Sequence, residues 1–330
     1  MSSSERLCVV VPAFNEGAGL RQLHARLAPV LRSLDLDARV LFVDDGSSDD
    51  TWETIESLSA LDPTVGGLRL SRNFGKELAM TAGLDHAEAD AVVVIDADLQ
   101  DPPELIPQFV ARWREGCDVV YGRRTHRPGE GWVKRATAAG FYRLMGRLSP
   151  TPIPRDTGDF RLLSRRALDA LHGLRERHRF MKGLFTWVGY RQCAVDYQRE
   201  PRHTGRSKFN YWKLWNFALD GITGFSTLPL RVATYVGVLA ALLAFLFGAW
   251  IIAKTLIWGD DVAGYPSLMT AMLFLGGLQL IALGVIGEYL GRLYDESKQR
   301  PLYLIDRCRP AARDGEAALA PRRSGVSSVP

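Results

Sequence analysis

The sequence is poor in cysteine and in net charge, and it begins without an apolar leader. The formal net charge over 330 residues is only +4, so we expect no nucleic-acid partner. Residues 1–6 are polar and the apolar run after them is broken at Pro12, which argues against a signal peptide. The cysteines show no C-x-x-C spacing, which argues against a disulfide framework or a zinc site and fits a reducing compartment. There are four of them, Cys8, Cys117, Cys193 and Cys308.

Charge is absent from two long stretches near the C-terminus. Val232–Ile252 and Ser267–Gly287 contain no Asp, Glu, Lys or Arg. At about 1.5 Å per residue, helices of these lengths would each span roughly 31 Å, which matches a hydrocarbon core of roughly 30 Å. The alternative is a pair of buried core helices, but core helices seldom run so long without a charge. We therefore predict two membrane-spanning helices, at 231–254 and 267–290.

Two spans would return the chain to the side of the membrane where it began. The N-terminal part and the C-terminal tail then share a compartment. Basic residues flank the spans on that shared side, and the positive-inside rule places it in the cytoplasm. These residues are Arg231, Arg292, Lys298 and Arg300. The sequence thus predicts a multi-pass protein of the inner (cytoplasmic) membrane. Small residues on the second span could pack helix on helix in a homo-oligomer; they are Gly276, Gly277, Gly284 and Gly287.

The N-terminal part alternates short apolar runs with helical patterns. Continuous apolar runs of this length fit buried parallel strands, and strands that alternate with helices predict a layered α/β sheet. The runs cover 7–11, 39–43, 91–95 and 117–122. In such sheets ligands bind at the carboxyl ends of the strands. The first three runs lead there into polar or acidic residues, namely Asn15, Glu16, Asp44, Asp45, Asp96 and Asp98. We predict a binding site where these ends meet.

The segment Asp96-Ala-Asp98-Leu-Gln100 is the clearest chemical signal. On an extended chain, alternate residues point to one side, so two carboxylates and an amide oxygen would share a face. Hard oxygen ligands at this spacing suit Mg²⁺ or Mn²⁺, which also bridges a diphosphate. A solvated turn is the alternative, which the following Asp101-Pro102-Pro103 makes plausible.

Four motifs in order resemble glycosyltransferase family 2, which has the GT-A (Rossmann-like) fold. They are Val11-Pro-Ala-Phe-Asn-Glu16, Val43-Asp-Asp-Gly-Ser-Ser-Asp49, Ser71-Arg-Asn-Phe-Gly-Lys-Glu77 and Asp96-Ala-Asp-Leu-Gln-Asp-Pro-Pro-Glu104. More narrowly, they resemble the polyprenyl-phosphate glycosyltransferases, such as the bactoprenol glucosyltransferase and dolichol-phosphate mannose synthase types. The resemblance continues through 156–161, 179–183, 220–226 and 287–292, so it covers residues 7 to about 305.

The resemblance implies a function and an organisation. The function is inverting, metal-dependent transfer of one sugar to polyprenyl (undecaprenyl) phosphate, for modification of a cell-envelope glycan, and we expect the sugar to be glucose from UDP-glucose. The predicted parts are a cytoplasmic GT-A nucleotide-sugar domain at 1–207, interfacial amphipathic helices at 208–230, spans at 231–254 and 267–290 joined by an extracytoplasmic loop at 255–266, and a cytoplasmic tail at 291–330 whose end is disordered.

The resemblance also assigns site residues. The nucleotide-sugar would be held by Pro12, Asn15, Glu16, Asp44, Asp45, Gly75, Lys76 and Asp96. The metal would be held by Asp96, Asp98 and Gln100, and catalysis would involve Asp98, Arg123 and Asp159. Basic side chains suit an anionic acceptor, because Arg forks bind phosphate oxygens and Lys acts as a point charge. The expected lipid-phosphate ligands are Arg123, Arg135, Arg199, Arg202, Ser207 and Lys208. A basic face resting on anionic lipid is the alternative for these residues.

The role of Asp159 stays open between three possibilities. It lies after Gly158, where hydroxyl-accepting relatives place a catalytic base; it could orient a substrate; or it could be a structural acid paired to Arg161. A phosphate acceptor is already ionised near neutral pH and needs no strong base. The chain lacks the Gln-x-x-Arg-Trp motif of processive relatives, which favours one sugar per lipid. The rival functions are a hydroxyl-accepting or polymer-forming transferase and a non-catalytic membrane adaptor.

Overall fold

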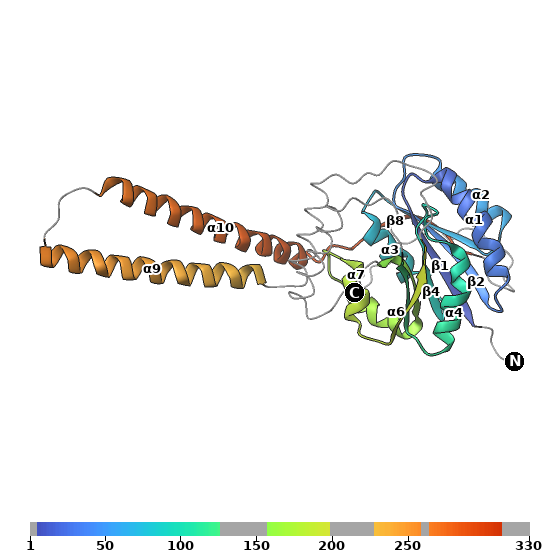
Figure 1. Ribbon diagram of the computed structural model, residues 1–330. Helices are drawn as coiled ribbons and strands as arrows, with labels where there is room; N and C mark the ends of the chain where they lie inside the picture. The colour runs from blue at the N-terminus through green and yellow to red at the C-terminus, as the bar shows by residue number, and fades with distance from the viewer. Residues whose placement is uncertain (1–4, 126–156, 199–227, 259–263, 312–330) are drawn as a thin grey trace.

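The computed structural model describes residues 5–125, 157–198, 228–258 and 264–311. The predicted interfacial helices at 208–230 fall almost wholly outside these residues, as does the predicted disordered end of the tail. The described N-terminal part folds as a layered α/β domain, which confirms the predicted fold class, and a long helical hairpin follows it (Figure 1).

The sheet contains eight of the described strands. They are β1 (Arg6–Ala13), β2 (Asp37–Asp44), β3 (Val65–Leu70), β4 (Ala91–Val94), β5 (Val119–Arg124), β6 (Thr157–Ser164), β7 (Gln192–Tyr197) and β8 (Ile305–Arg309). Their order across the sheet is β7-β5-β6-β4-β1-β2-β3-β8. The central strands β4, β1, β2 and β3 are parallel, so their carboxyl ends lie at one edge. β6 runs antiparallel between β4 and β5.

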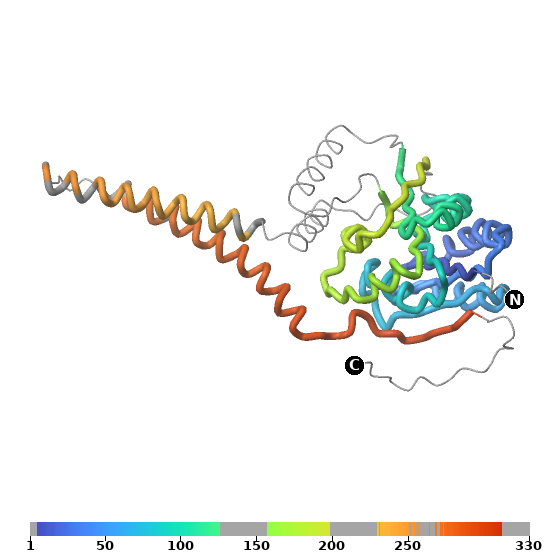
Figure 2. Tube along the Cα trace, turned by 90° about the horizontal axis from the view of Figure 1, so that it is seen from below, coloured from blue at the N-terminus to red at the C-terminus, as the bar shows by residue number. Residues whose placement is uncertain are grey.

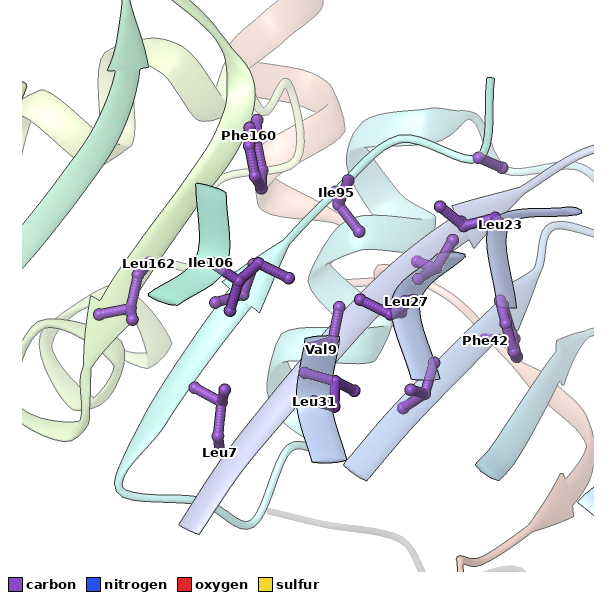
Figure 3. Packing of buried hydrophobic residues seen from close by; sticks show 14 of the residues in the cluster. Leu7, Val9, Leu23, Leu27, Leu31, Phe42, Ile95, Ile106, Phe160 and Leu162 are labelled. Carbon is purple, nitrogen blue, oxygen red and sulfur yellow. The ribbon is translucent and has the colours of Figure 1, made fainter. Parts of the chain in front are cut away.

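Helices cover both faces of the sheet. One face carries α1 (Gly17–Arg32), α2 (Thr51–Leu61) and α4 (Ile106–Arg114), which follows the short 3-10 helix η1 (Pro103–Leu105); the other carries α3 (Lys76–Asp85), α6 (Arg165–His172) and α7 (Met181–Trp187). Successive strand residues point to opposite faces, so Val9 and Val11 enter one core cluster and Val10 enters the other. Figure 3 shows the first cluster, in which Leu27 of α1 and Ile106 of α4 pack over the sheet.

The hairpin consists of α9 (Leu228–Trp258) and α10 (Tyr265–Ser297). Both contain a stretch long and apolar enough to cross a membrane, at Val232–Trp250 and Phe274–Ser297, and none of either stretch is buried inside the protein. Figures 1 and 2 show the two helices side by side, projecting away from the sheet. A Cβ built on Gly276, Gly277, Gly284 or Gly287 would meet nothing within 4 Å among the described residues, so packing between copies at these positions stays a prediction.

After α10 the chain returns to the sheet and adds β8 to its edge, which the sequence reading missed. β8 pairs antiparallel with β3, and Figure 2 shows the segment that leads to it running along the domain. Just before β8, the Tyr303 hydroxyl donates to Asp85 over 2.8 Å, and the Ser71 amide donates to the Leu304 carbonyl over 2.9 Å. The C-terminal end of the hairpin is therefore attached to the sheet domain.

The expectation that the cysteines form no disulfide is wrong for one pair. Cys117 and Cys193 are bonded, with their Cα atoms 6.0 Å apart and a separation of 76 positions in the chain. The pairing of β5 with β7 brings them together, since Val120 lies opposite Cys193. Local spacing rules detect motifs such as C-x-x-C and have no access to a strand pairing of this kind. Cys8 and Cys308 are free.

Candidate functional site

The site lies at the carboxyl ends of the parallel strands. Ala13 at the end of β1 pairs with Asp44 at the end of β2, and Val94 at the end of β4 pairs with Val10. The loops after β1 and β2 are cross-linked through Asn15, whose amide donates to the Ser47 hydroxyl over 2.9 Å and whose side-chain oxygen accepts from the Ser48 amide over 2.9 Å. Asn15 has φ +55°, a left-handed conformation that asparagine tolerates. The predicted strand ends therefore do meet.

Asp44 presents an available acceptor at this corner. Its side chain is fully buried, and Oδ1 accepts from the Ser47 amide over 2.9 Å. Oδ2 lies 3.4 Å from Arg69 Nε in an ion pair but accepts no hydrogen bond from the described part of the chain. A buried carboxylate oxygen without a donor is costly, so the position suits an N–H or O–H of a ligand such as a nucleobase or ribose. Pro12 and Glu16 flank the same corner.

Asp45 holds the loop that leads into α3. Its two oxygens accept from the amides of Phe74 and Gly75, over 2.7 and 2.9 Å. Burial raises the pKa of Asp45, and these hydrogen bonds oppose the rise. Gly75 has φ +98°, and Gly46 has φ +66° with its would-be Cβ 2.4 Å from the backbone of Arg72, so both turns require glycine. Asp45 and Gly75 therefore determine the shape of the loop, and the oxygens of Asp45 are already occupied by hydrogen bonds from the backbone.

Lys76 links two acids on different strands. Its ammonium lies 2.8 Å from an oxygen of Asp96, just after β4, and 2.5 Å from an oxygen of Asp159, on β6. Burial disfavours the charged ammonium, but the two carboxylates outweigh it and raise the pKa of Lys76 above its ordinary value. Burial likewise acts to raise the pKa of Asp159, but Lys76 and Lys182 prevail and hold it below its ordinary range. Burial raises the pKa of Asp96 despite Lys76.

The interpretation of Asp159 as a partner of Arg161 is corrected by this arrangement. Arg161 is buried, donates to the Gly158 carbonyl over 2.7 Å and stacks on the Phe185 ring at 3.9 Å, while Asp159 takes Lys76 as its ion-pair partner. Burial lowers the pKa of Arg161 to about 10.

The segment from Asp96 to Gln100 is not the extended strand end that we predicted. β4 ends at Val94, residues 97 and 98 form a turn, and Leu99 has φ +60°. The amide of Gln100 donates to Asp98 Oδ1 over 3.2 Å. The prediction that the side chain of Gln100 shares a face with those of Asp96 and Asp98 therefore fails, because side chains alternate between two faces only along an extended strand, and the strand has ended before the turn. The alternative of a turn in this segment, which the following Asp101-Pro102-Pro103 made plausible, describes the local backbone better.

A divalent cation still fits Asp96 and Asp98. Asp96 Oδ1 is buried and accepts no hydrogen bond from described residues, although Lys76 lies 2.7 Å away as an ion pair. Within the described ranges no three His, Cys, Asp or Glu side chains gather as a metal cage. The pair of carboxylates suits Mg²⁺ or Mn²⁺ bound with a substrate, because Mg²⁺ is commonly held by one or two carboxylates together with substrate phosphates.

The structure separates Arg123 from its neighbour Arg124. Arg123, which we expected to take part in catalysis and in binding the lipid phosphate, instead pairs with Asp196 through contacts of 2.6 and 2.8 Å and is 51% exposed. Arg124 points to the other side of β5, where its side chain is 15% exposed, donates to the Tyr197 hydroxyl over 3.1 Å and lies 3.6 Å from Asp101. Burial works to lower the pKa of Arg124, but the acids at this end, Asp101 foremost, raise it.

Arg124 is thus the basic residue that sequence reasoning missed. The alternation of side chains along a strand could have identified it. Val120 faces the first core cluster, so Arg124, four residues later, lies on the same face of β5, and Arg123 lies on the opposite face. The other expected phosphate ligands lie outside the described residues; they are Arg135, Arg199, Arg202, Ser207 and Lys208.

Comparison with known proteins decides the family. The profile of Glycosyl transferase family 2 matches residues 8–171, and that of the GtrB C-terminal hairpin matches residues 228–293. An uncharacterized glycosyltransferase of Synechocystis is 54% identical over 299 residues, which is 91% of this chain and 94% of that protein. The bactoprenol glucosyl transferase of Shigella phage SfV is 48% identical over 300 residues, covering 91% and 98%. The chain belongs to glycosyl transferase family 2.

Membership of this family makes the chain an enzyme, a glycosyltransferase, and removes the adaptor alternative. A solved structure of glucosyl-3-phosphoglycerate synthase from Mycobacterium tuberculosis aligns over 66% of this chain and 78% of that one, at 20% identity and a TM-score of 0.48. In the present chain, the edge of the sheet where the strands end carries an available hydrogen-bond acceptor, Asp44, and a charged cluster around Lys76. That combination suits a ligand with a hydrogen-bonding nucleoside at one end and negative charge at the other.

Proposed function

We propose that this glycosyltransferase transfers one glucose from UDP-glucose to polyprenyl phosphate, with inversion, at the cytoplasmic face of the inner membrane. The proposal is supported by the relative named bactoprenol glucosyl transferase, whose likeness runs through almost its whole length. The lipid-linked glucose would then supply a later step of cell-envelope glycan modification. UDP-glucose is preferred as the donor because it carries the sugar that this relative is named for.

The observation that carries the proposal is the attachment of an apolar hairpin to the domain that holds the strand-end site. At the end of α10, Glu296 accepts from the Arg177 amide over 2.7 Å and Asp295 lies 3.2 Å from His178 Nε2. β8 then pairs with β3, whose carboxyl end leads into the loop held by Asp45. A soluble acceptor would need no such attachment, whereas an acceptor dissolved in the bilayer must be met at its surface.

The same attachment supports the proposed topology. If α9 and α10 both cross the membrane, the chain enters and leaves the membrane on the same side. Because β8 follows α10 and belongs to the sheet of the catalytic domain, that side is the one on which the catalytic domain lies. The basic residues Arg231, Arg292, Lys298 and Arg300 lie at this end of the hairpin or just beyond it, and the positive-inside rule supports a cytoplasmic location for that side.

The side chains have distinct roles in the proposed reaction. Asp44 Oδ2 accepts a hydrogen bond from the nucleoside, and Lys76 supplies positive charge beside the donor diphosphate. Asp96 and Asp98 would hold a divalent cation, which would stabilise the negative charge of the leaving diphosphate. An oxygen of the polyprenyl phosphate forms a bond to the anomeric carbon as the bond to the diphosphate oxygen breaks on the opposite face. Arg124 is the described cation placed to attract the acceptor phosphate.

The charge state of Asp159 supports a phosphate acceptor over a hydroxyl acceptor. A general base works best when its pKa lies near the operating pH. Lys76 and Lys182 hold the pKa of Asp159 below its ordinary range against the effect of burial, and Lys76 occupies one of its oxygens. Such a carboxylate removes protons poorly, so we assign it to orientation of Lys76 and of the sugar. An ionised phosphate attacks without a base.

A donor and acceptor screen tests this proposal. Purified full-length protein in detergent is given undecaprenyl phosphate or a soluble sugar acceptor with a panel of nucleotide-sugars, and radiolabel is followed into the organic phase. We expect label only with undecaprenyl phosphate and chiefly from UDP-glucose. Label in a soluble glycan would favour the hydroxyl-accepting alternative. A different preferred donor would overturn the choice of sugar and leave the acceptor assignment intact.

A further inference from the structure

Behind the charged cluster lies a half-buried acid that the proposed reaction does not use. Glu77 follows Lys76 in the first turn of α3, and its Oε2 accepts from the amide of Met181 over 3.0 Å. Met181 is the first residue of α7, and 104 positions separate it from Glu77. The residue before it, Phe180, supplies no side-chain hydrogen bond to this end of α7. Glu77 therefore binds a helix end that lies far away in the chain.

α7 in turn supports the segment that carries Asp159. Phe185 of α7 lies under the Arg161 guanidinium at 3.9 Å, and Arg161 donates to the carbonyl of Gly158, the residue before Asp159. Lys182 of α7 adds positive charge near Asp159. A displacement of α7 would therefore reach Asp159 through a stacked pair, a hydrogen bond and a charge.

We propose that Glu77 is a positioning residue, which holds α7 against the start of α3 and thereby keeps Asp159 within reach of Lys76. Lys76 and Glu77 are adjacent in the first turn of α3, so this turn determines the position of both members of the Lys76–Asp159 ion pair. Lys76 contacts Asp159 directly, and Glu77 acts on Asp159 through α7. The packing agrees, because Met181 is fully buried and its sulfur lies 3.8 Å from the Thr81 hydroxyl, one turn further along α3. The inference rests on the proposed function, in which Lys76 and Asp159 act at the transfer site.

The test compares Glu77→Ala with Glu77→Gln in the undecaprenyl phosphate assay. The amide oxygen of Gln can still accept from Met181, whereas Ala cannot. Because small misplacements of reacting groups cost up to about a hundredfold in rate, we expect Glu77→Ala to lower kcat roughly ten- to a hundredfold. The KM for the donor should stay within about twofold, because Glu77 does not face the nucleoside, and Glu77→Gln should restore most of kcat. Glu53→Ala is the matched control, since Glu53 is an exposed acid in the first turn of α2.

A second pair of variants removes the donor of the same hydrogen bond. Met181→Ala removes the side chain and keeps the amide N–H, and Met181→Pro removes both. Proline is tolerated at the first position of a helix, so the fold of α7 should survive. We expect Met181→Pro to be slower than Met181→Ala, and Glu77→Ala to add little on top of Met181→Pro. If Glu77→Ala slows both Met181 variants equally, the contact does not act as inferred.

Amide hydrogen exchange of peptides covering residues 177–187 tests whether Glu77 stabilises the position of α7, independently of the sugar-transfer activity. Exchange should be faster in Glu77→Ala than in the wild type and in Glu77→Gln. Unchanged exchange, or equal kcat in Glu77→Ala and the wild type, would overturn the inference. Absence of transfer by the wild-type protein would instead overturn the proposed function, with the exchange result still deciding whether Glu77 holds α7.

Discussion

The Lys76 ammonium lies 2.5 Å from a carboxylate oxygen of Asp159, although 83 residues separate the two in the chain. Lys76 begins α3 on one side of the site, and Asp159 lies on β6, which enters the sheet antiparallel beside β4. The same ammonium contacts Asp96, so one cation compensates two carboxylates, of which Asp159 is buried and Asp96 is half-buried. Two carboxylates this crowded need a cation or a proton nearby, which makes Lys76 the electrostatic centre of the described site.

Replacement of Lys76 should therefore be severe. Lys76→Ala removes two charge-assisted hydrogen bonds, each worth about 1.5–3 kcal/mol, and leaves Asp96 and Asp159 to repel each other. We expect transfer to fall by roughly a hundredfold or more, together with weaker nucleotide-sugar binding by calorimetry. Arg112→Ala, which removes an exposed cation from α4, should behave as the wild type. Full activity in Lys76→Ala would mean that the cluster lies outside the reaction.

Adjacent arginines on β5 allow an internally controlled test of the acceptor. Arg124 faces Asp101 and the charged cluster, while Arg123 forms an ion pair with Asp196 on the other side of the strand. Arg124→Gln should raise the concentration of undecaprenyl phosphate needed for half-maximal rate by roughly ten- to a hundredfold, the equivalent of one lost charge-assisted contact. Arg123→Gln should change it little. The opposite pattern in an acceptor titration would restore Arg123 to the role that the sequence suggested.

The cation site predicts a ligand-binding effect that does not depend on turnover. Asp98→Asn keeps the size of the side chain and removes its charge, so UDP binding in Mg²⁺ or Mn²⁺ should fall to the level seen in EDTA. The fold should survive, because Asp98 lies in a turn at the rim. Asp35→Asn, an exposed acid after α1, serves as the control. Equal UDP affinity with and without divalent cation in the wild type would refute the assignment of Asp96 and Asp98.

The strands that the sequence predicted correctly are those with uninterrupted apolar runs. Residues 7–11, 39–43 and 91–95 lie in or largely within β1, β2 and β4, where residues on both faces are buried, and the predicted run at 117–122 overlaps β5. β3 has the sequence Val-Gly-Gly-Leu-Arg-Leu, and two glycines conceal it. β6 carries Asp159 and Arg161, and β8 is exposed along its whole length, so neither shows an apolar pattern. Tertiary pairing, rather than local preference, makes these segments strands.

The same distinction applies to the site. Asp44, Asp45 and Asp96 could be located from sequence because each directly follows an apolar run. The contact of Lys76 with Asp159 could not, since it depends on β6 lying next to β4. The disulfide between Cys117 and Cys193 depends in the same way on the pairing of β5 with β7. Chemistry that one strand end supplies is visible in the sequence, whereas chemistry shared between strands requires their order.

The pH dependence of stability should report on Glu77. Burial, reinforced by the charge of Asp159 and opposed by Lys76 and Lys182, raises the pKa of Glu77 from 4.5 to about 7. A group whose pKa is raised by folding stabilises the fold below its unfolded pKa and loses that contribution as pH rises towards its folded pKa. The wild type should therefore lose stability between about pH 4.5 and 7 relative to Glu77→Gln, which stays neutral. Thermal unfolding midpoints in detergent at several pH values measure this, and Glu53→Gln should give a constant difference.

The hairpin predicts which positions an impermeant thiol reagent can reach in intact cells. Cys308 is exposed on β8, so the test begins from a Cys308→Ser variant. Ser267→Cys places a thiol near the start of α10, at the end remote from the sheet domain, and should react from outside. Leu61→Cys places one on a residue that is 83% exposed at the end of α2, and it should react only after the cells are permeabilised. Because Leu61 is so exposed, its protection in intact cells would reflect the membrane and not the fold. Labelling of Leu61→Cys but not Ser267→Cys in intact cells would reverse the proposed orientation, and labelling of neither after permeabilisation would show that the reagent, rather than the topology, had failed.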